Sequence, residues 1–413
     1  WSQIKMQPYN FKCFKCSVCG SEFGFDDLLY TCPKCGNNVN IVFDYEKISE
    51  KLKSSGLGEL SSMYRYLPLL PISQDIELPP IDVGMTPLIA PPFLRKHLDM
   101  PFLYLKDDGR NPTGSLKDRA SSFIVSKAIH EKRPVITTAS TGNAGAALAG
   151  MAAASGMKTV IFVPASAPEA KIAQLKVYGS DVRLVDGTYD DAFALCERTV
   201  EETKMYCRNT GTNPFTSEGK KTVSFEIAEQ IAKSLMVPDD LSKHPMRAPD
   251  VMCVSVGDGN IITGVYKGFR DLHSLGLIDK MPRLIGCQSS GSDYIAKSFA
   301  KGIEDGSMEK ISCSTICDSI SACLPSDRVN AVKAVKETGG QYVVVEDDDV
   351  IDCIAEIGKY SGVFAEPAAA CAYCGMKKAV SEGIIKKDEV IVVLITGTGL
   401  KDVKAAQKSV ASK

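Results

Sequence analysis

The stretch "VMCVSVGDGNIITGVYKGF", residues 251–269, contains the pattern that decides the fold. Its first seven residues form an apolar run that predicts a buried strand, and a glycine-containing loop then leads into a segment with helical periodicity. Similar runs rich in Val and Ile recur along the chain, bounded by Gly, Pro or Asp and separated by helical segments such as residues 189–204. They lie at residues 101–108, 134–140, 159–165, 181–187, 282–289, 341–347 and 390–397. This alternation predicts parallel strands joined by right-handed crossovers, and therefore an α/β fold with open sheets.

Length and composition place the chain among globular proteins that act on small molecules. Its 413 residues are 44% hydrophobic and 24% charged, which is ordinary for a globular chain of about two or three domains. The formal net charge is −2 and the sequence pI is about 6.2. No excess of positive charge favours nucleic acid or an anionic membrane surface, so we expect neither as a partner.

The distribution of apolar residues and cysteines predicts a cytoplasmic protein. The sequence has no uncharged apolar run of about 18 residues, and its start, "WSQIKMQPYNFK", lacks the basic and apolar regions of a secretory signal. Fifteen cysteines are too few for a disulfide scaffold in a chain of this length and fit a reducing compartment. Cys371 and Cys374 lie in an alanine-rich helical pattern, where we interpret them as small core residues.

Two Cys-x-x-Cys-Gly motifs occur in "CFKCSVCGSEFGFDDLLYTCPKCG", residues 13–36. Their separation of twelve residues is typical of four thiolates arranged tetrahedrally around one zinc ion. The four cysteines are Cys16, Cys19, Cys32 and Cys35. Cys13 is an alternative to Cys16 in this set, and a ribbon that has lost its metal but kept its fold is a further alternative. Because four cysteines leave no open position for a substrate, we expect a structural zinc in a ribbon-like head.

Three loops follow predicted strands and open predicted helices, which is the position where open α/β sheets bind ligands. The first of them, "NPTGSLKDRAS" (residues 111–121), places Lys117 at the start of a helical segment. A charged ammonium gains nothing from the positive end of a helix dipole, so this position favours a lysine that is uncharged or covalently modified. An ordinary surface lysine is the alternative.

The second loop opens the segment "ASTGNAGAALAGMAAASG", residues 139–156. Ser140, Thr141 and Asn143 place two hydroxyls and an amide beside the N–H groups of a helix start, a combination that suits a carboxylate. The same residue types also form ordinary helix-capping turns, so the composition alone leaves both interpretations open.

The third loop is the "GDGN" of the opening stretch, residues 257–260. Gly257 and Gly259 let backbone amides converge on a phosphate at a helix start. The spacing matches neither a Walker loop nor a dinucleotide fingerprint, which predicts a phosphate-bearing cofactor of another kind. Asp258 brings a negative charge close to that phosphate, and this costs energy unless its side chain turns away or caps the loop.

Together these loops resemble those of the pyridoxal-phosphate enzymes of the tryptophan-synthase β type, whose lysine is held as a Schiff base. Within that group the chain is most similar to the threonine synthase family, although Leu116 stands where phenylalanine is commoner. The segments that resemble this family are "NPTGSLKDRAS", "ASTGNAG", "AKIAQLKVYGSDV", "NPFTSEGKKTVSFEIAEQ", "DSISACLPSDRVNAVKAVKETGG", "FAEPAAA" and "ITGTGLKD". The resemblance extends over nearly the whole chain from about Cys16 and implies two open parallel-sheet α/β domains behind the cysteine-rich head.

The resemblance implies a role for each candidate residue. Lys117 would bind pyridoxal 5'-phosphate covalently and move protons between substrate carbons. Asn143 would bond the ring oxygen of the cofactor, and Ser140 and Thr141 would bind the substrate carboxylate. Thr396 would face the pyridine nitrogen, where a hydroxyl does not protonate the ring; an ordinary strand end is the alternative. The cofactor phosphate would lie on the backbone amides of Gly257, Asp258, Gly259, Asn260 and Ile261.

The reaction implied is the conversion of O-phosphohomoserine and water to threonine and phosphate, by γ-elimination and then β-addition of water. A second phosphate must then be bound, and the candidates are Lys171, Asn213 and Lys221, each with an ordinary surface role as its alternative. Cysteate synthase, which exchanges the phosphate of O-phosphoserine for sulfite, would share nearly every motif, and a related pyridoxal-phosphate enzyme of β-replacement or elimination is a further alternative. A non-catalytic protein that binds the cofactor is the alternative from a different class.

We expect three parts in the chain. They are an N-terminal extension (residues 1–80), a small α/β domain (121–210) and a large cofactor-binding domain (81–120 and 211–413). Residues 233–250, the most loop-like interior stretch, are expected to connect the two α/β units. The resemblance also suggests a homodimer.

Overall fold

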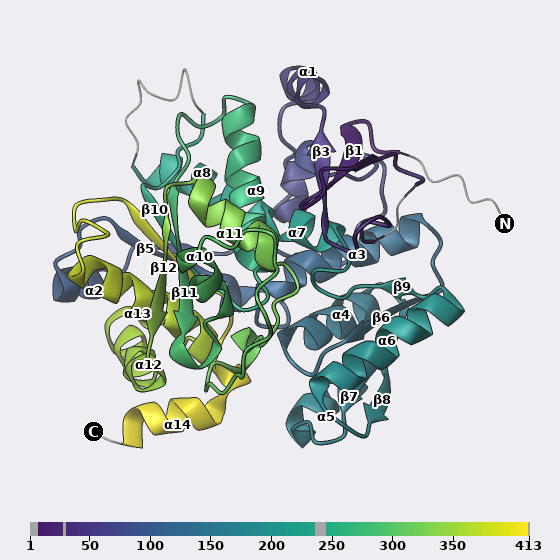
Figure 1. Ribbon diagram of the computed structural model, residues 1–413. Helices are drawn as coiled ribbons and strands as arrows, with labels where there is room; N and C mark the ends of the chain where they lie inside the picture. Colours follow the sequence, from purple (N-terminus) through teal and green to yellow (C-terminus); the bar gives the residue numbers. More distant parts are fainter. Residues whose placement is uncertain (1–6, 28–29, 236–244, 412–413) are drawn as a thin grey trace. The chain divides into compact units, whose positions relative to one another are not determined.

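The computed structural model describes residues 7–27, 30–235 and 245–411 (Figure 1). Helices and strands alternate along most of these ranges, as the sequence predicts for an α/β fold. Residues 236–244 of the connection predicted at 233–250 lie outside the described residues, and the described parts of this stretch belong to one compact unit, so they do not connect two units.

The chain divides into two compact units, each made of two separate stretches of sequence. Unit 1 comprises Trp1–Gly84 and Asn111–Lys220, and unit 2 comprises Met85–Arg110 and Lys221–Lys413. This grouping differs from the predicted boundaries because it places residues 111–120 and the N-terminal extension together with residues 121–220. The reason is local packing: the helix that begins at Lys117 packs against other helices of unit 1.

Unit 2 is built on a six-stranded sheet with the order β12-β11-β10-β13-β5-β4. All neighbouring pairs are parallel except β4 with β5. The strands are β4 (Leu88–Ile89), β5 (Leu103–Asp107), β10 (Val251–Ser255), β11 (Arg283–Ser289), β12 (Gln341–Val345) and β13 (Ile391–Ile395). The central strands β10, β13 and β5 are buried along their whole length, as expected where helices cover both faces of a parallel sheet.

Helices flank the sheet of unit 2 (Figure 1). The alanine-rich α13 packs along β10, β11, β12 and β13, and α12 packs on α13; α9 and α11 also pack against the sheet. Cys371 and Cys374 are buried in α13, which confirms their interpretation as core residues. The helices are α2 (Pro92–Leu98), α8 (Thr222–Ser234), α9 (Asn260–Ser274), α10 (Tyr294–Ala300), α11 (Arg328–Glu337), α12 (Asp347–Ser361), α13 (Pro367–Ser381) and α14 (Val403–Ala411). Single 3-10 turns are η2 (Asp108–Arg110), η3 (Ser290–Ser292), η4 (Asp318–Ile320) and η5 (Gly399–Lys401).

Unit 1 contains a four-stranded parallel sheet with the order β8-β7-β6-β9. Successive residues of β7 face opposite sides: Phe162 packs with Ala192 and Cys196 of α6, whereas Ile161 packs with Ala149 of α4. The strands are β6 (Val135–Ala139), β7 (Lys158–Pro164), β8 (Asp181–Val185) and β9 (Tyr206–Cys207). The helices are α3 (Lys117–His130), α4 (Asn143–Ala154), α5 (Glu169–Val177), α6 (Tyr189–Thr203) and α7 (Phe215–Lys220).

The helix α3, which begins at the candidate lysine, is almost entirely buried. It packs against α4 and α7, and a 3-10 segment, η1 (Met63–Leu69), adds a polar contact. The hydroxyl of Tyr64 in η1 lies 3.0 Å from Ser122 Oγ and 2.7 Å from Ser126 Oγ of α3. The N-terminal extension therefore contributes directly to the environment of this helix.

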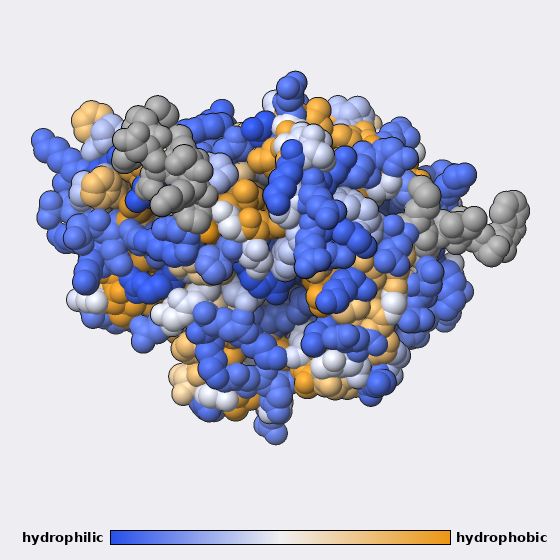
Figure 2. All heavy atoms as spheres, turned by 90° about the horizontal axis from the view of Figure 1, so that it is seen from above, coloured by the Kyte–Doolittle hydropathy of each residue, from blue (hydrophilic) through white to orange (hydrophobic). Residues whose placement is uncertain are grey.

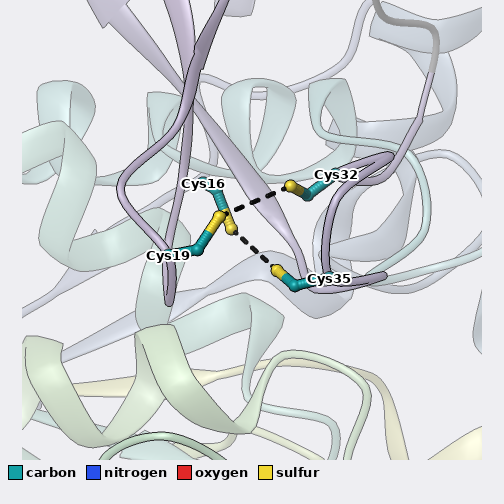
Figure 3. Close-up of side chains that lie close together, drawn as sticks. All are labelled: Cys16, Cys19, Cys32 and Cys35. Atoms are coloured by element: carbon teal, nitrogen blue, oxygen red, sulfur yellow. Dashed lines mark hydrogen bonds between the residues drawn. The ribbon is translucent and has the colours of Figure 1, made fainter.

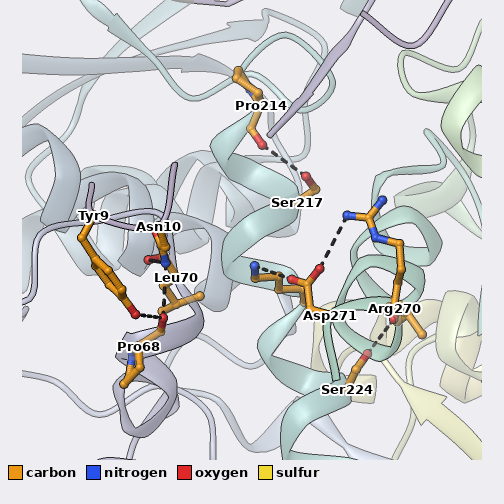
Figure 4. Close-up of polar contacts among 11 residues, drawn as sticks. Tyr9, Asn10, Pro68, Leu70, Pro214, Ser217, Ser224, Arg270 and Asp271 are labelled. Carbon is orange, nitrogen blue, oxygen red and sulfur yellow. Dashed lines mark hydrogen bonds and ion pairs between the residues drawn. The ribbon is translucent and has the colours of Figure 1, made fainter. Parts of the chain in front are cut away.

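The cysteine-rich head forms a three-stranded antiparallel sheet of β1 (Phe11–Cys16), β2 (Glu22–Phe23) and β3 (Val39–Phe43), followed by α1 (Tyr45–Ser55). Just before β1, Tyr9 Oη and Asn10 Nδ2 donate to the Pro68 carbonyl at 2.6 and 3.2 Å (Figure 4). The rings of Phe14 and Phe215 pack edge to face, with centroids 6.0 Å apart. These contacts join the head to η1 and α7.

The surface is mixed in character. The face drawn in Figure 2 is mainly hydrophilic, with apolar residues in scattered groups. Among the described residues, no helix combines the length and hydropathy required to cross a bilayer. All fifteen cysteines are free thiols in the structure.

Candidate active site

Four cysteine sulfurs of the head converge on one point (Figure 3). All four sulfurs lie within 4.8 Å of one another, with Cys16 and Cys35 at 3.4 Å and Cys19 and Cys32 at 3.7 Å. Zinc–sulfur bonds of about 2.3 Å place tetrahedral sulfurs roughly 3.8 Å apart. The cluster therefore has the size that a zinc ion requires, and it contains Cys16, not the alternative Cys13.

The backbone of both knuckles is shaped for this convergence. Gly20 and Gly36 follow the second cysteine of each motif and have φ of +69° and +71°, a region that glycine adopts without strain. The Val18 N–H donates to Cys16 Sγ at 3.5 Å. Hydrogen bonding to the Ser21 hydroxyl lowers the pKa of Cys19 to about 6, which favours the thiolate that a metal binds.

Lys117 is the first residue of α3 and is half-buried. The turn before it is closed by the Gly114 N–H, which donates to the Asn111 carbonyl at 2.8 Å, and Gly114 has a φ of +83°. The buried Asp118 carboxylate accepts from the Thr113 N–H at 2.7 Å. These bonds hold the backbone on both sides of Lys117 in one conformation.

The loop expected to bind the substrate carboxylate lies between the end of β6 and the start of α4, also in unit 1. Ser140 and Thr141 are half-buried, and Asn143 is buried as the first residue of α4. Ser140 Oγ accepts from the Gly142 N–H at 3.3 Å. Gly145 allows the tight entry, because a Cβ there would lie 2.2 Å from the Ser140 carbonyl oxygen. The first turn of α4 has no acidic side chain, so its positive dipole end can attract an anion.

Residues 257–261, expected to bind the cofactor phosphate and called the phosphate loop below, join β10 to α9 in unit 2. Gly259 caps α9 with a φ of +89°, and a Cβ on Gly257 would lie 2.6 Å from the Cα of a neighbouring residue, so both positions require glycine. Asp258 Oδ1 accepts from the Ser326 N–H at 3.3 Å. The Asp258 carboxylate thus caps a neighbouring segment, which is the condition that the sequence sets for an aspartate beside the expected phosphate site.

Thr396 directly follows β13 and is buried. Its hydroxyl donates to Glu366 Oε1 at 3.4 Å, and a Cβ on Gly397 would lie 2.5 Å from the same carboxylate oxygen. Glu366 belongs to the "FAEPAAA" segment, but the spacing of that segment contains no signal that pairs it with Thr396. The structure therefore adds a buried carboxylate that the sequence reasoning missed.

Lys171 lies in the first turn of α5 and is half-buried. Asn213 is buried, and both ends of its amide are used within unit 1: Oδ1 accepts from the Phe215 N–H at 2.9 Å and Nδ2 donates to the Cys207 carbonyl at 2.8 Å. Of these two candidates for substrate phosphate, Lys171 is the one with exposed side-chain surface.

Lys221, the third candidate, lies in unit 2 and has an internal counter-ion. Its Nζ lies 2.7 Å from Asp271 Oδ2, and both side chains are buried. Asp271 also lies 3.5 Å from the guanidinium of Arg270 (Figure 4). A buried pair of this kind is disrupted only at a high energetic cost, so Lys221 is less suited to bind an incoming phosphate.

Two buried hydroxyls lie beside the segments that would hold a pyridoxal-phosphate cofactor. Ser115 Oγ, two residues before Lys117, and Ser255 Oγ, two residues before Gly257, have no hydrogen-bond partner among the described residues. Buried hydroxyls are rarely left without a partner, so each suits a polar ligand. Taken separately, the lysine at a helix start in unit 1 and the glycine-shaped helix start in unit 2 each have the residue types that a part of this cofactor requires.

Comparison with known proteins agrees with these features. The family model described as "Pyridoxal-phosphate dependent enzyme" matches residues 81–397. A threonine synthase of Methanocaldococcus jannaschii is 35% identical over 394 residues, which cover 95% of this chain and 93% of the relative. A threonine synthase of Mycobacterium tuberculosis is 31% identical and covers 84% of this chain and 90% of the relative.

Solved structures support the same fold. A diaminopropionate ammonia lyase from Escherichia coli superposes with a TM-score of 0.65 at 18% identity, covering 80% of this chain and 88% of that chain. A threonine deaminase from Solanum lycopersicum has a TM-score of 0.64 at 20% identity, and the match covers 79% of this chain and 84% of that chain. These likenesses show the architecture of two parallel-sheet α/β domains, which confirms the predicted fold class. The chain therefore belongs to the pyridoxal-phosphate-dependent enzyme family, within the group of full-length relatives named threonine synthase.

Proposed function

We propose that this enzyme is a threonine synthase, which converts O-phosphohomoserine and water to threonine and phosphate. The similarity to relatives of that name along almost the entire chain carries the proposal. The site residues support it, because each residue type that the reaction needs is present at the end of a strand or the start of a helix.

Lys117 would hold the cofactor covalently, and the amides of residues 257–261 would bind its phosphate. When bound, pyridoxal phosphate supplies an electron sink that stabilises negative charge on the substrate carbon next to the amino group. Lys117 Nζ would accept a proton from one substrate carbon and deliver it to another. The hydrogen bonds around Asn111, Thr113 and Asp118 keep this amine in position.

The start of α4 would bind the substrate carboxylate through the hydroxyls of Ser140 and Thr141 and the helix N–H groups, and Asn143 would bond the ring oxygen of the cofactor. Thr396 would donate its hydroxyl to the pyridine nitrogen. A hydroxyl has one proton, so Thr396 must give up its donation to Glu366, and at 3.4 Å that bond is long enough to be exchanged at little cost.

Lys171 would bind the phosphate of the substrate, and this assignment yields a quantitative prediction. In the Lys171→Ala variant, KM for O-phosphohomoserine should rise about 10- to 100-fold, because a hydrogen bond to a charged group contributes roughly 1.5–3 kcal/mol. Lys176→Ala is the matched control, since Lys176 is exposed in the last turn of the same helix. If steady-state kinetics give equal KM values for the two variants, Lys171 does not bind the substrate phosphate.

Product analysis tests the reaction itself. The enzyme is incubated with O-phosphohomoserine alone, and separately with O-phosphoserine and sulfite, and amino acids and phosphate are quantified by chromatography. We expect threonine and phosphate in equal amounts from the first incubation. Cysteate from the second incubation would instead identify a cysteate synthase, and bound cofactor without any product would favour a non-catalytic binding protein.

Two further predictions accompany this function. We propose that the four-cysteine cluster binds one structural zinc ion, and that the enzyme forms a homodimer. The homodimer and the cytoplasmic location stay predictions. Sedimentation velocity of the holoenzyme measures its oligomeric state directly.

A further inference from the structure

Asp327 has no role in the site described above, yet its carboxylate is buried beside the phosphate loop of unit 2. The residue is 2% exposed and directly precedes α11. Its Oδ2 accepts from Asn260 Nδ2 at 2.8 Å, and its Oδ1 accepts from Asn330 Nδ2 at 2.6 Å. Burial raises the pKa of Asp327, while the bonds from Asn330 and Asn260 favour its charged form. Two amide donors from two different helices thus share one buried carboxylate.

The phosphate loop also accepts hydrogen bonds from the segment that contains Asp327. Asp258 accepts twice from the chain that leads into α11: its carbonyl from the Asp327 N–H at 2.8 Å and its Oδ1 from the Ser326 N–H at 3.3 Å. Asp258 therefore holds the start of α11, while Asp327 holds Asn260, the first residue of α9. Asp258, which precedes α9, therefore fixes the start of α11, and Asp327, which precedes α11, fixes the start of α9.

Close packing adds to these hydrogen bonds between the starts of α9 and α11. A Cβ on Gly259 would lie 2.8 Å from the Asp327 carbonyl oxygen, so the loop touches the segment before α11 without a side chain between them. Asn260, Thr263 and Lys267 lie at helical positions i, i+3 and i+7 and therefore share one face of α9. The positive charge of the buried Lys267 also favours the charged form of Asp327, and the Thr263 hydroxyl donates to the Gly259 carbonyl at 3.0 Å.

We propose that Asp327 is the positioning residue of the phosphate loop, which holds residues 257–261 in the conformation that presents their amides to the cofactor phosphate. The inference rests on the proposed function in one respect, namely that this loop binds that phosphate. A preorganised set of donors binds more tightly than one that must be ordered by the ligand. A carboxylate is required because two amide donors need two acceptor oxygens, whereas an asparagine would supply only one.

The test compares two ligands that differ only in the phosphate. Apoenzymes of the wild type and of Asp327→Asn are titrated with pyridoxal phosphate and, separately, with pyridoxal, following the visible absorbance of bound cofactor. We expect Kd for pyridoxal phosphate to rise about 10- to 100-fold in the variant, while Kd for pyridoxal changes less than about twofold. Asp250→Asn is the matched control: Asp250 lies just before β10, at the end of the strand opposite the loop, and accepts from the Val390 N–H at 2.8 Å.

A second variant removes the donor of the same bond. Asn260→Ala should weaken the binding of pyridoxal phosphate by a similar factor. The double variant should bind it no more weakly than either single variant, because both changes break the same hydrogen bond between Asn260 and Asp327. If Asp327→Asn does not fold, Asn260→Ala alone carries the comparison. Equal loss of affinity for both ligands, or no loss for either, would overturn the positioning role. A wild type that binds pyridoxal as tightly as pyridoxal phosphate would instead overturn the assignment of the phosphate loop itself.

Discussion

The Lys117→Ala variant is expected to lose turnover by at least about 10³-fold while keeping its fold. Proton transfer by a positioned group alone contributes about 10²–10⁴-fold, and covalent attachment of the cofactor is lost as well. The fold should persist because Lys117 is half-buried at the start of α3, whereas the buried contacts of that helix come from residues 118–128. The measurement is kcat with O-phosphohomoserine, beside a thermal melt of each apoenzyme.

Lys158→Ala is a suitable control, since Lys158 is an exposed lysine at the start of β7 in the same unit. Its kcat and its visible absorbance should match those of the wild type. Borohydride reduction followed by peptide mass analysis should place the cofactor on the peptide that contains Lys117. Repeated turnovers by Lys117→Ala, or label on another lysine, would contradict the assignment.

The Cys32→Ser variant is expected to lose zinc and to be less stable by at least about 3 kcal/mol. Cys32 is almost fully buried, and its sulfur lies 3.7 Å from that of Cys19 within the cluster. Without the metal, the two cysteine turns lose the ion that links them, and the aromatic packing of Phe14 on Phe215 should be weakened. Zinc content by mass spectrometry and unfolding by calorimetry are measured on the same samples.

Cys13→Ser is the matched control, because Cys13 lies on β1 three residues before Cys16 but does not belong to the cluster. It should retain one zinc per chain and the melting temperature of the wild type. If Cys32→Ser retains full zinc, or loses zinc without any change in unfolding, the cluster has no structural metal role. Turnover is informative as a second readout, since the structural zinc should contribute to it only through stability.

The inner strands of both α/β sheets were predictable from the sequence because a parallel strand covered on both faces must be apolar along its length, whereas the edge strand β8 is largely exposed. All eight runs form strands, from β5 at Leu103–Asp107 to β13 at Ile391–Ile395. Strands β4 and β9 were missed, because two residues are too short to show any periodicity. The four-cysteine cluster was also predictable, because its four cysteines are close in sequence and a zinc site requires their spacing.

Contacts between residues far apart in the sequence were not predictable. Glu366 meets Thr396, and Asp327 meets Asn260, only because the chain folds the corresponding segments together. The internal bonds of Asn213 and the ion pair of Lys221 with Asp271 depend on burial in the same way. Residue type and local spacing identify groups that are able to bind a phosphate, but they do not reveal which of those groups the fold has already engaged.

The parallel pairing of β5 with β13 has a consequence for synthesis on the ribosome. Leu103 pairs with Ile391, so β5, which lies next to the edge strand β4, lacks its other neighbour until β13 is translated, after the entire second stretch of unit 1 has emerged. Until then, the apolar β5 has an open edge, and contacts this distant in sequence form slowly. We therefore expect unit 2 to be the part that most needs protection by chaperones while the nascent chain is incomplete.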